Sequence, residues 1–357
     1  MVTIMKNIMK SGLMLTAMAS APSFAGYTID INDDQKLTFG GYFKADLRAI
    51  DGDIAYRDFW VGNNVVKEDT TETRFNIRES RFNIKYQHSD FTGVLEWDFY
   101  DDQQPTGTAE TVTGGHSLRL RHAYIQYGKW KVGQTWSTFM PLVSIAEALD
   151  FGGAHVGQTF VRQSQVRYTD GGLELALENP STQSGVSQSI PDVVGRYTFK
   201  GDWGQIAVAG LMRSLDDGGD TTKADGTQFS YNIHGRIKAY GKDDFRFSYN
   251  GGHSGRYVSP GANIHDKAVD GDIYDTQAFT VAYRHFWTEN LRSNLYYGAV
   301  KIDDQIGADG KRTDRKQIAI NLMTNISPKT TVGIEVGNYK TESADTNYLQ
   351  LSAKYAL

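Results

Sequence analysis

The chain has 357 residues and contains no cysteine, which excludes disulfides, thiol nucleophiles and thiolate metal sites. Long apolar runs are also lacking. The mean hydropathy is −0.46, and no stretch is long and apolar enough for a transmembrane helix. This excludes a helical membrane protein. It does not exclude a membrane protein built from strands, because alternation with polar residues dilutes the apolar ones.

An excess of basic residues is missing too. The chain has 37 Lys and Arg against 42 Asp and Glu, for a formal net charge of −5. Proteins that bind nucleic acid through the phosphate backbone usually carry a basic balance. We therefore expect no nucleic-acid partner.

Catalytic and nucleotide-binding motifs are absent from the sequence. No G-x-S-x-G or H-E-x-x-H occurs, no glycine-rich phosphate loop follows a strand, and the 8 His are scattered. We predict no catalytic residue, no metal and no cofactor. A Ser/His pair assembled from separate strands, as in a barrel hydrolase, remains an alternative that motif searches do not detect.

The N-terminus has the pattern of a secretory signal peptide. Lys6 and Lys10 precede the apolar run "SGLMLTAMAS", and the small residues Ser23 and Ala25 occupy the −3 and −1 positions of a cleavage site. This predicts a signal peptide at residues 1–25, cleaved after Ala25. With no stop-transfer helix, we expect export across the inner membrane of a bacterium with two membranes.

Aromatic residues and glycine are abundant, with 20 Tyr, 17 Phe and 37 Gly, and the hydrophobic residues alternate with polar ones. In "KLTFGGYFKADLRA" (36–49), Phe39 and Phe43 alternate with Thr38, Tyr42 and Lys44, which is the period of a strand with one apolar and one polar face. The polar faces carry Arg and Lys, which a dry protein core accommodates only at a high free-energy cost. The apolar faces are therefore expected to point outward to lipid.

About 16 alternating segments are joined by connections that are short and long in turn. The short ones lie at 87–91, 127–131, 168–172, 200–204, 240–244, 286–290 and 326–330. The long ones lie at 50–73, 101–116, 135–160, 179–191, 214–227, 252–274, 303–315 and 340–346. This rhythm is typical of outer-membrane barrels. It predicts an all-β fold, a 16-stranded antiparallel transmembrane β-barrel over residues 36–357 after a short periplasmic segment at 26–35.

Tryptophans and two irregular segments refine this prediction. Trp130, Trp203 and Trp287 all fall at short turns, where an interfacial aromatic belt is expected. The alternation shifts phase between Ile77 and Phe82, and again between Leu120 and Ala123. Either a β-bulge or a wrongly assigned strand would produce such a shift.

The third long connection, 135–160, is unusually apolar and lacks charge except at Glu147, Asp150 and His155. An apolar loop exposed to water is unfavourable. We expect this loop to fold into the barrel lumen as a constriction that includes Met140, Glu147 and Asp150, with a short helix within "LVSIAEALDF" (142–151). A loop that caps the barrel or packs on a neighbouring subunit is the alternative.

Basic residues outnumber acidic ones on the predicted polar faces. The acidic candidates there are Asp46, Glu96, Asp98, Glu174, Glu178, Asp192 and Glu335. The basic candidates for lining the pore include Lys44, Arg48, Arg81, Arg119, Arg121, Arg167, Arg196, Arg236, Arg246 and Arg284. A positively charged channel concentrates small anions and speeds their entry. Structural salt bridges with the wall carboxylates are the alternative role for many of these arginines.

The expected function is therefore passive diffusion of small solutes through the outer membrane, with a preference for anions. An outer-membrane barrel hydrolase is the first alternative. A soluble β-protein that binds glycans is a second alternative, and it would stay in solution without detergent. Expected partners are small anionic solutes and the outer-membrane lipid, including lipopolysaccharide.

The run "RHAYIQYGKWKVGQTWSTFMPL", followed by "ALDFGG" and "GQTFVRQSQVRYT", resembles the DcaP-like outer-membrane porins. The resemblance covers nearly the whole chain after the signal peptide. It implies a homotrimer of 16-stranded barrels, an inward-folded third loop, and uptake of small anions such as dicarboxylates. By matching stretch, Arg119, Arg121, Arg162 and Arg167 would lie on strands that flank this loop.

Two features differ from that family's pattern. Some members carry an N-terminal coiled coil, whereas here only "GYTIDINDDQ" is expected between the cleavage site and the first strand. Porins usually end in Phe, whereas this chain ends in Leu357. The terminal alternation is kept, so barrel assembly is still expected.

Overall fold

The structure is a computed structural model that describes residues 26–54, 66–100, 117–150, 156–179, 190–216, 224–258, 268–269, 271–303 and 314–357. The predicted signal peptide lies outside the described residues, as do the middle parts of most long connections. Within the described residues, no helix is long and apolar enough to cross a membrane.

Strands make up most of the described chain. The first ten are β1 (Gly26–Asp30), β2 (Gln35–Ile54), β3 (Val66–Asn76), β4 (Arg81–His88), β5 (Phe91–Asp98), β6 (Arg119–Tyr127), β7 (Trp130–Trp136), β8 (Arg162–Asp170), β9 (Leu173–Glu178) and β10 (Asp192–Gly201). The others are β11 (Gly204–Leu215), β12 (Gly226–Lys238), β13 (Asp244–Gly252), β14 (Ala268–Val269), β15 (Asp272–Ile273), β16 (Thr276–Phe286), β17 (Leu291–Ile302), β18 (Arg315–Ser327), β19 (Thr330–Thr341) and β20 (Asp345–Ala356).

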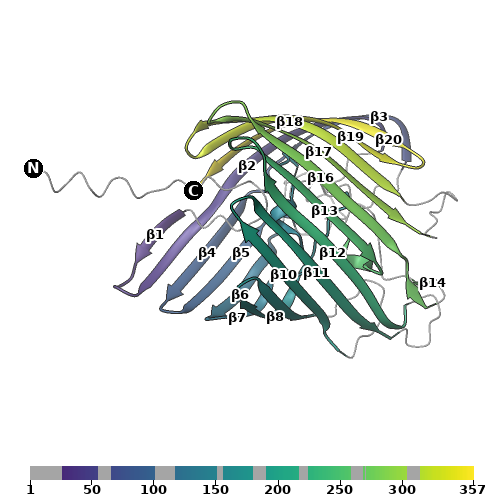
Figure 1. Cartoon of the computed structure of the whole chain (residues 1–357). Coiled ribbons are helices and arrows are strands. Elements are labelled where there is room, and N and C mark those ends of the chain that lie inside the picture. Colours follow the sequence, from purple (N-terminus) through teal and green to yellow (C-terminus); the bar gives the residue numbers. More distant parts are fainter. Residues whose placement is uncertain are drawn as a thin grey trace, which may run out of the picture.

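The strands form a closed ring. Nearly all of its strands pair antiparallel with the neighbouring strand in sequence, and β13 pairs with β16 because β14 and β15 form a separate hairpin. The pairing of β2 with β20 over residues 42–52 and 346–356 joins the two ends of the sheet. On its other edge β2 pairs with β3 over residues 46–54 and with β4 over residues 35–42, so β3 and β4 share one position in the ring. The oblique strands can be followed around the ring in Figure 1. The predicted 16-stranded antiparallel barrel is confirmed.

The short strand β1 pairs with the same edge of β2 as β20 does, beside the end of β20. Its residues 26–30 pair with residues 36–40 of β2, just past the point where β20 ends, and the Leu357 N–H donates to the Gly41 carbonyl. Part of the segment at 26–35 thus forms a strand of its own.

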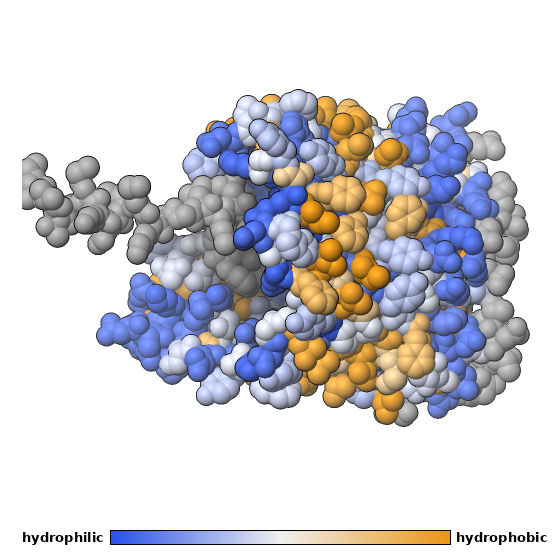
Figure 2. Space-filling view, viewed as in Figure 1, coloured by the Kyte–Doolittle hydropathy of each residue, from blue (hydrophilic) through white to orange (hydrophobic). Residues whose placement is uncertain are grey.

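The two faces of the ring have opposite character. On β12, Phe229 and Tyr231 are 60% and 48% exposed, whereas Ser230, Asn232 and His234 are buried. Figure 2 shows the exposed apolar side chains as a band on the outside of the molecule, between two more hydrophilic zones. The apolar face is therefore the outer face, and the polar face is the inner one.

The two phase shifts have different causes. Between β5 and β6, Glu96 pairs with His122 but Trp97 pairs with Leu120, so Arg121 is the extra residue of a bulge. As a result the adjacent residues Arg121 and His122 are both buried. At residues 77–80 the shift marks a turn between β3 and β4 rather than a bulge.

The expectation of a short helix within "LVSIAEALDF" (142–151) was wrong. Within the described residues 142–150 the structure has a single 3₁₀ turn, η2 (Leu142–Ser144), and a second one, η3 (Gly255–Tyr257), follows β13. Backbone carbonyls of residues 145, 147 and 149 accept hydrogen bonds from side chains of the barrel wall. These bonds replace the intrahelical ones that a helix would need.

Candidate functional site

Residues 137–150 between β7 and β8, called here the β7–β8 segment, are almost entirely buried. Phe139, Met140 and Ile145 are 0% exposed, and Glu147 is 2% exposed. Because the segment has little secondary structure of its own, its backbone polar groups need partners elsewhere.

The first part of the segment is held by β9, β10 and β13. The Thr138 N–H donates to Glu178 Oε1 at 2.7 Å. Arg196 Nη1 donates to the Met140 carbonyl at 3.1 Å, and Arg246 Nη1 donates to the Ile145 carbonyl at 2.5 Å. The first part of the segment thus contacts polar side chains of β9, β10 and β13 in chain order.

Glu147 is the strongest anchor of the segment. Its carboxylate pairs with Arg292 of β17 at 2.6 Å and with Arg284 of β16 at 3.0 Å, and Asn321 Nδ2 of β18 donates to its backbone carbonyl at 2.9 Å. Burial alone would raise the pKa of the Glu147 carboxyl. The hydrogen bonds and charges of Arg292 and Arg284 more than offset this and lower the pKa to about 2.

The last part of the segment is held by β19, β20 and β2. The Leu149 N–H donates to Glu335 Oε2 at 2.8 Å, and the Leu149 carbonyl accepts from Lys44 Nζ at 2.7 Å and from Gln350 at 2.9 Å. Asp150 pairs with Arg48 at 2.6 Å. Many of the predicted pore-lining residues therefore contact the segment directly: Lys44, Arg48, Arg196, Arg246 and Arg284.

A second group of predicted residues lies together on β4, β6 and β8. We call Arg81, Arg119, Arg121 and Arg162 the arginine cluster. Asp98 of β5 pairs with Arg119 at 2.7 Å and with Arg121 at 2.8 Å. Glu96 of β5 pairs with Arg121 at 2.7 Å and lies 3.7 Å from Arg81. Four guanidinium groups thus gather around two carboxylates.

Arg162 has no carboxylate partner in this cluster and instead lies against an aromatic ring. Its guanidinium carbon is 4.3 Å from the centroid of the Trp136 ring, and that of Arg121 is 5.8 Å from the same centroid. Among the described residues, the buried Nη1 atom of Arg162 has no hydrogen-bond partner. This atom is a donor that a bound anion could satisfy.

The two remaining predicted residues lie outside both groups. Arg167 donates to the Trp136 carbonyl at 2.5 Å and to Glu174 at 3.2 Å, so it supports the start of the β7–β8 segment. Arg236 is half-buried and is the cross-strand neighbour of Arg246.

Several site residues had no predicted role. Glu79 lies in the turn between β3 and β4 and forms an ion pair with Lys44. Trp136 supports the arginine cluster. Tyr257 of η3 donates to Asp192 at 2.7 Å, and its carbonyl accepts from the Phe160 N–H at 3.1 Å. Residues 254–257 lie in a long connection without strand alternation, so no periodic signal placed them at the inner face.

The described residues contain no group of three or more His, Asp or Glu side chains placed to hold a metal ion. The polar groups of the site are instead arranged as guanidinium–carboxylate pairs and as donors to backbone carbonyls. Such a site can bind or repel charged solutes.

Comparison with known proteins identifies one matching family and several solved structures with the same fold. The model of a family described as DcaP outer membrane protein matches residues 83–355. The crystal structure of the outer membrane channel DcaP of Acinetobacter baumannii is similar with a TM-score of 0.75 and 23% identity, over 93% of this chain and 100% of that one. None of the curated proteins compared with the chain matches it.

Two porin structures share the fold at lower identity. An anion-selective porin from Comamonas acidovorans has a TM-score of 0.59 and 10% identity, over 91% of this chain and 100% of that one. The trimer form of OmpT, an outer membrane protein of Vibrio cholerae, has a TM-score of 0.59 and 14% identity, over 91% and 100%.

Proposed function

The chain belongs to the DcaP outer membrane protein family, and from this premise we propose that it is a passive diffusion channel that prefers small anions, dicarboxylates among them. The proposed channel carries out no chemical step. Solutes cross down their concentration gradient, and the charges of the inner wall set which solutes enter.

The arginine cluster is the observation that carries the proposal. Four guanidinium groups on β4, β6 and β8 surround two carboxylates of β5, and the Nη1 atom of Arg162 lacks a partner among the described residues. An excess of fixed positive charge on a wall of low dielectric constant favours anions and repels cations. Guanidinium also matches the geometry of a carboxylate.

The β7–β8 segment provides the narrow zone in this proposal. An open 16-stranded barrel leaves a wide aqueous channel, in which fixed charges act weakly on passing solutes. The contacts of residues 138–150 with inner-face side chains of β9, β10, β13, β16–β20 and β2 support a position inside the ring. A segment there would bring solutes closer to the arginine cluster.

The proposal includes a homotrimer that is exported by the predicted signal peptide at residues 1–25. Support for a trimer comes from the trimer form of the similar OmpT structure. The exposed apolar band of the outer face supports contact with outer-membrane lipid, including lipopolysaccharide.

Reversal potentials test the selectivity directly. The purified protein is inserted into planar bilayers under a potassium chloride gradient, and the sign of the zero-current voltage reports whether anions or cations permeate better. We expect anion preference. Cation preference would contradict the selectivity and leave the channel itself intact, whereas no conductance would contradict the channel.

Competition identifies the solute class. Chloride conductance is measured while succinate, inorganic phosphate or neutral sugars are added at equal concentration. We expect succinate to reduce the chloride current more than phosphate does, and neutral sugars to have the smallest effect. An equal effect of all additives would argue for a non-selective pore.

A further inference from the structure

Three lysines lie on neighbouring strands of the outer face, at the end of the ring that carries the long connections. They are Lys301 of β17, Lys316 of β18 and Lys340 of β19, and all are exposed. By strand alternation they share the outer face with exposed apolar residues of the same strands, such as Leu295, Ile318 and Val336. Lysines at this position stand just above the apolar band.

Two of these lysines face each other. Lys316 and Lys340 are direct cross-strand partners in the pairing of β18 with β19. Like charges in this position destabilise a sheet unless an anion lies between them. In the part of the chain that the structure describes, neither lysine forms an ion pair, although Asp345 is the partner of Lys340 on the next strand. Lys301, in contrast, pairs with Asp303 at 2.9 Å.

A groove of about 630 Å³ begins next to the lysine pair and runs along the outer face of β2 and β17–β20. Its lining is mostly apolar and includes the small side chain of Ala49. Ile318 and Asn338 line it and lie two residues from Lys316 and Lys340, a distance of roughly 7 Å along a strand.

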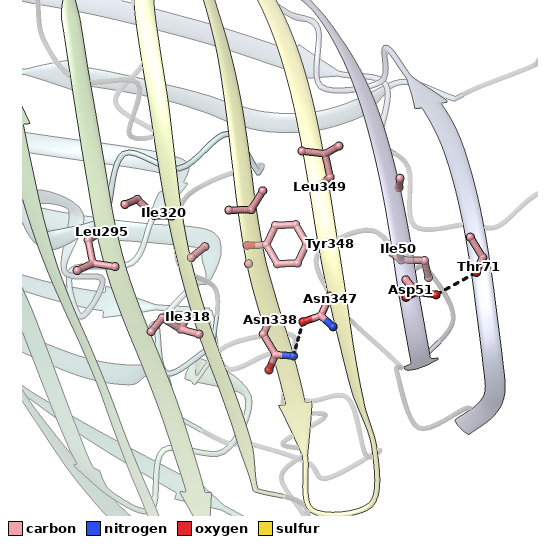
Figure 3. Close-up of a pocket in the computed structure, with 14 residues that line it drawn as sticks. Ile50, Asp51, Thr71, Leu295, Ile318, Ile320, Asn338, Asn347, Tyr348 and Leu349 are labelled. Carbon is pink, nitrogen blue, oxygen red and sulfur yellow. Dashed lines mark hydrogen bonds between the residues drawn. The ribbon is translucent and has the colours of Figure 1, made fainter.

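One end of the groove carries polar groups. Asn338 donates to Asn347 at 3.0 Å, and Thr71 donates to Asp51 at 3.0 Å. The pairing registers place Asn338, Asn347, Asp51 and Thr71 in one row across neighbouring strands. Figure 3 shows the two hydrogen-bonded pairs of this row. Amide, hydroxyl and carboxylate groups at this level can bind sugar hydroxyls, whereas the rest of the groove can hold only a hydrocarbon chain.

We propose that this face is a binding site for a phosphorylated glycolipid of the lipid A type. A phosphate lies between Lys316 and Lys340, the sugar headgroup lies over Asn338 and Asn347, and one acyl chain fills the groove. The bound phosphate removes the repulsion between the two ammonium groups through charge-assisted hydrogen bonds. The inference rests on the outer-membrane location and on the long connections facing outward, and it is independent of ion selectivity.

Native mass spectrometry of the purified chain with added diphosphoryl lipid A tests the site. We expect one tightly retained lipid A per chain. The double variant K316Q/K340Q should bind about tenfold more weakly, since it loses charge-assisted contacts. The matched control K242Q changes an exposed lysine at a short turn, which pairs with Glu289, and should bind like the unchanged chain.

Two further variants test the contacts of the headgroup and the contacts of the acyl chain separately. Asp345→Asn removes a carboxylate that repels the phosphate, so binding should become stronger. Ala49→Trp fills the groove, so binding should weaken while the lysine pair is untouched. Circular dichroism checks that each variant keeps its strand content.

Three results would overturn the inference. The first is equal binding of lipid A by K316Q/K340Q and the unchanged chain. The second is equal retention of phosphatidylglycerol from vesicles, since that would make the face a general anionic-lipid surface. The third is dissociation of an oligomer by Ala49→Trp with lipid binding unchanged, which would assign the groove to a subunit contact.

Discussion

Two sets of inner-face arginines serve different purposes, and they are called here the anchor side and the cluster side. Those of β10, β13, β16 and β17 bind the β7–β8 segment through its carbonyls and through Glu147. Those of β4, β6 and β8 gather around Glu96, Asp98 and Trp136 of the wall itself. The first set holds the segment in place, and the second gathers four guanidinium groups around two carboxylates. The same side chain type therefore acts as a structural anchor on one side and as a candidate solute contact on the other.

The largest expected effect comes from breaking the anchor side at Glu147. Glu147→Gln leaves Arg284 and Arg292 without this carboxylate, and removing one partner of a buried ion pair costs about 3–5 kcal/mol. We expect a lower temperature of thermal unfolding and a larger, noisier single-channel conductance. Glu289→Gln, at an exposed turn, is the control. An unchanged conductance would mean that the segment does not limit the ion path.

The next largest effect separates the two sides by selectivity. Arg162→Gln combined with Arg119→Gln removes charge from the arginine cluster, so the anion-to-cation permeability ratio should fall several-fold. Arg196→Gln combined with Arg246→Gln removes the same charge from the anchor side and should change the ratio less. Reversal potentials in planar bilayers measure both. Equal shifts for the two variants would abolish the distinction between the sides.

A smaller effect is expected at Trp136. Trp136→Leu keeps an apolar side chain but removes the ring on which the Arg162 guanidinium lies, a contact worth ~0.5–2 kcal/mol. Arg162 should then be less well positioned, and the anion preference should fall less than in the arginine variants. Phe160→Leu, which changes another ring beside Trp136, tests whether loss of packing alone gives the same result.

The smallest effect is expected from pH. The pKa of Glu147 is lowered from the unfolded value of about 4.3 to about 2. The stability contributed by its ion pairs is therefore fully present above about pH 4.3 and is lost as the pH falls through about 2. Conductance should be constant between pH 8 and pH 5. An increase within that range, absent in Glu147→Gln, would contradict the assigned ionisation of Glu147.

Much of the fold follows from alternation and turn rhythm. The sixteen-strand prediction, the short turns and the outward apolar face all depend on the period of two, which the barrel imposes on every strand. The phase shift at 120–123 also predicted a local irregularity of the strand correctly. It marked the bulge at Arg121, which brings Arg121 and His122 to the inner face together.

The path of the β7–β8 segment could not be predicted in the same way. Its composition of Leu, Ile, Ala and Glu favours a helix, yet wall side chains bind its carbonyls and hold it extended around η2. Alternation assigned Arg196, Arg246 and Arg81 equally to the polar face. Only the position of the segment separates anchors from the arginine cluster, and that position depends on contacts far apart in the sequence.

The closure of the ring has a consequence for biogenesis. The bonds between Arg48 and Gln350 join residues 302 positions apart, and they belong to the first and last long strands of the ring. A pairing of such high contact order cannot form until synthesis of the chain is complete. Until then both edges of the growing sheet expose unpaired backbone groups, which invite aggregation. The pairing of β2 with β20 is therefore the step that removes both exposed edges at once.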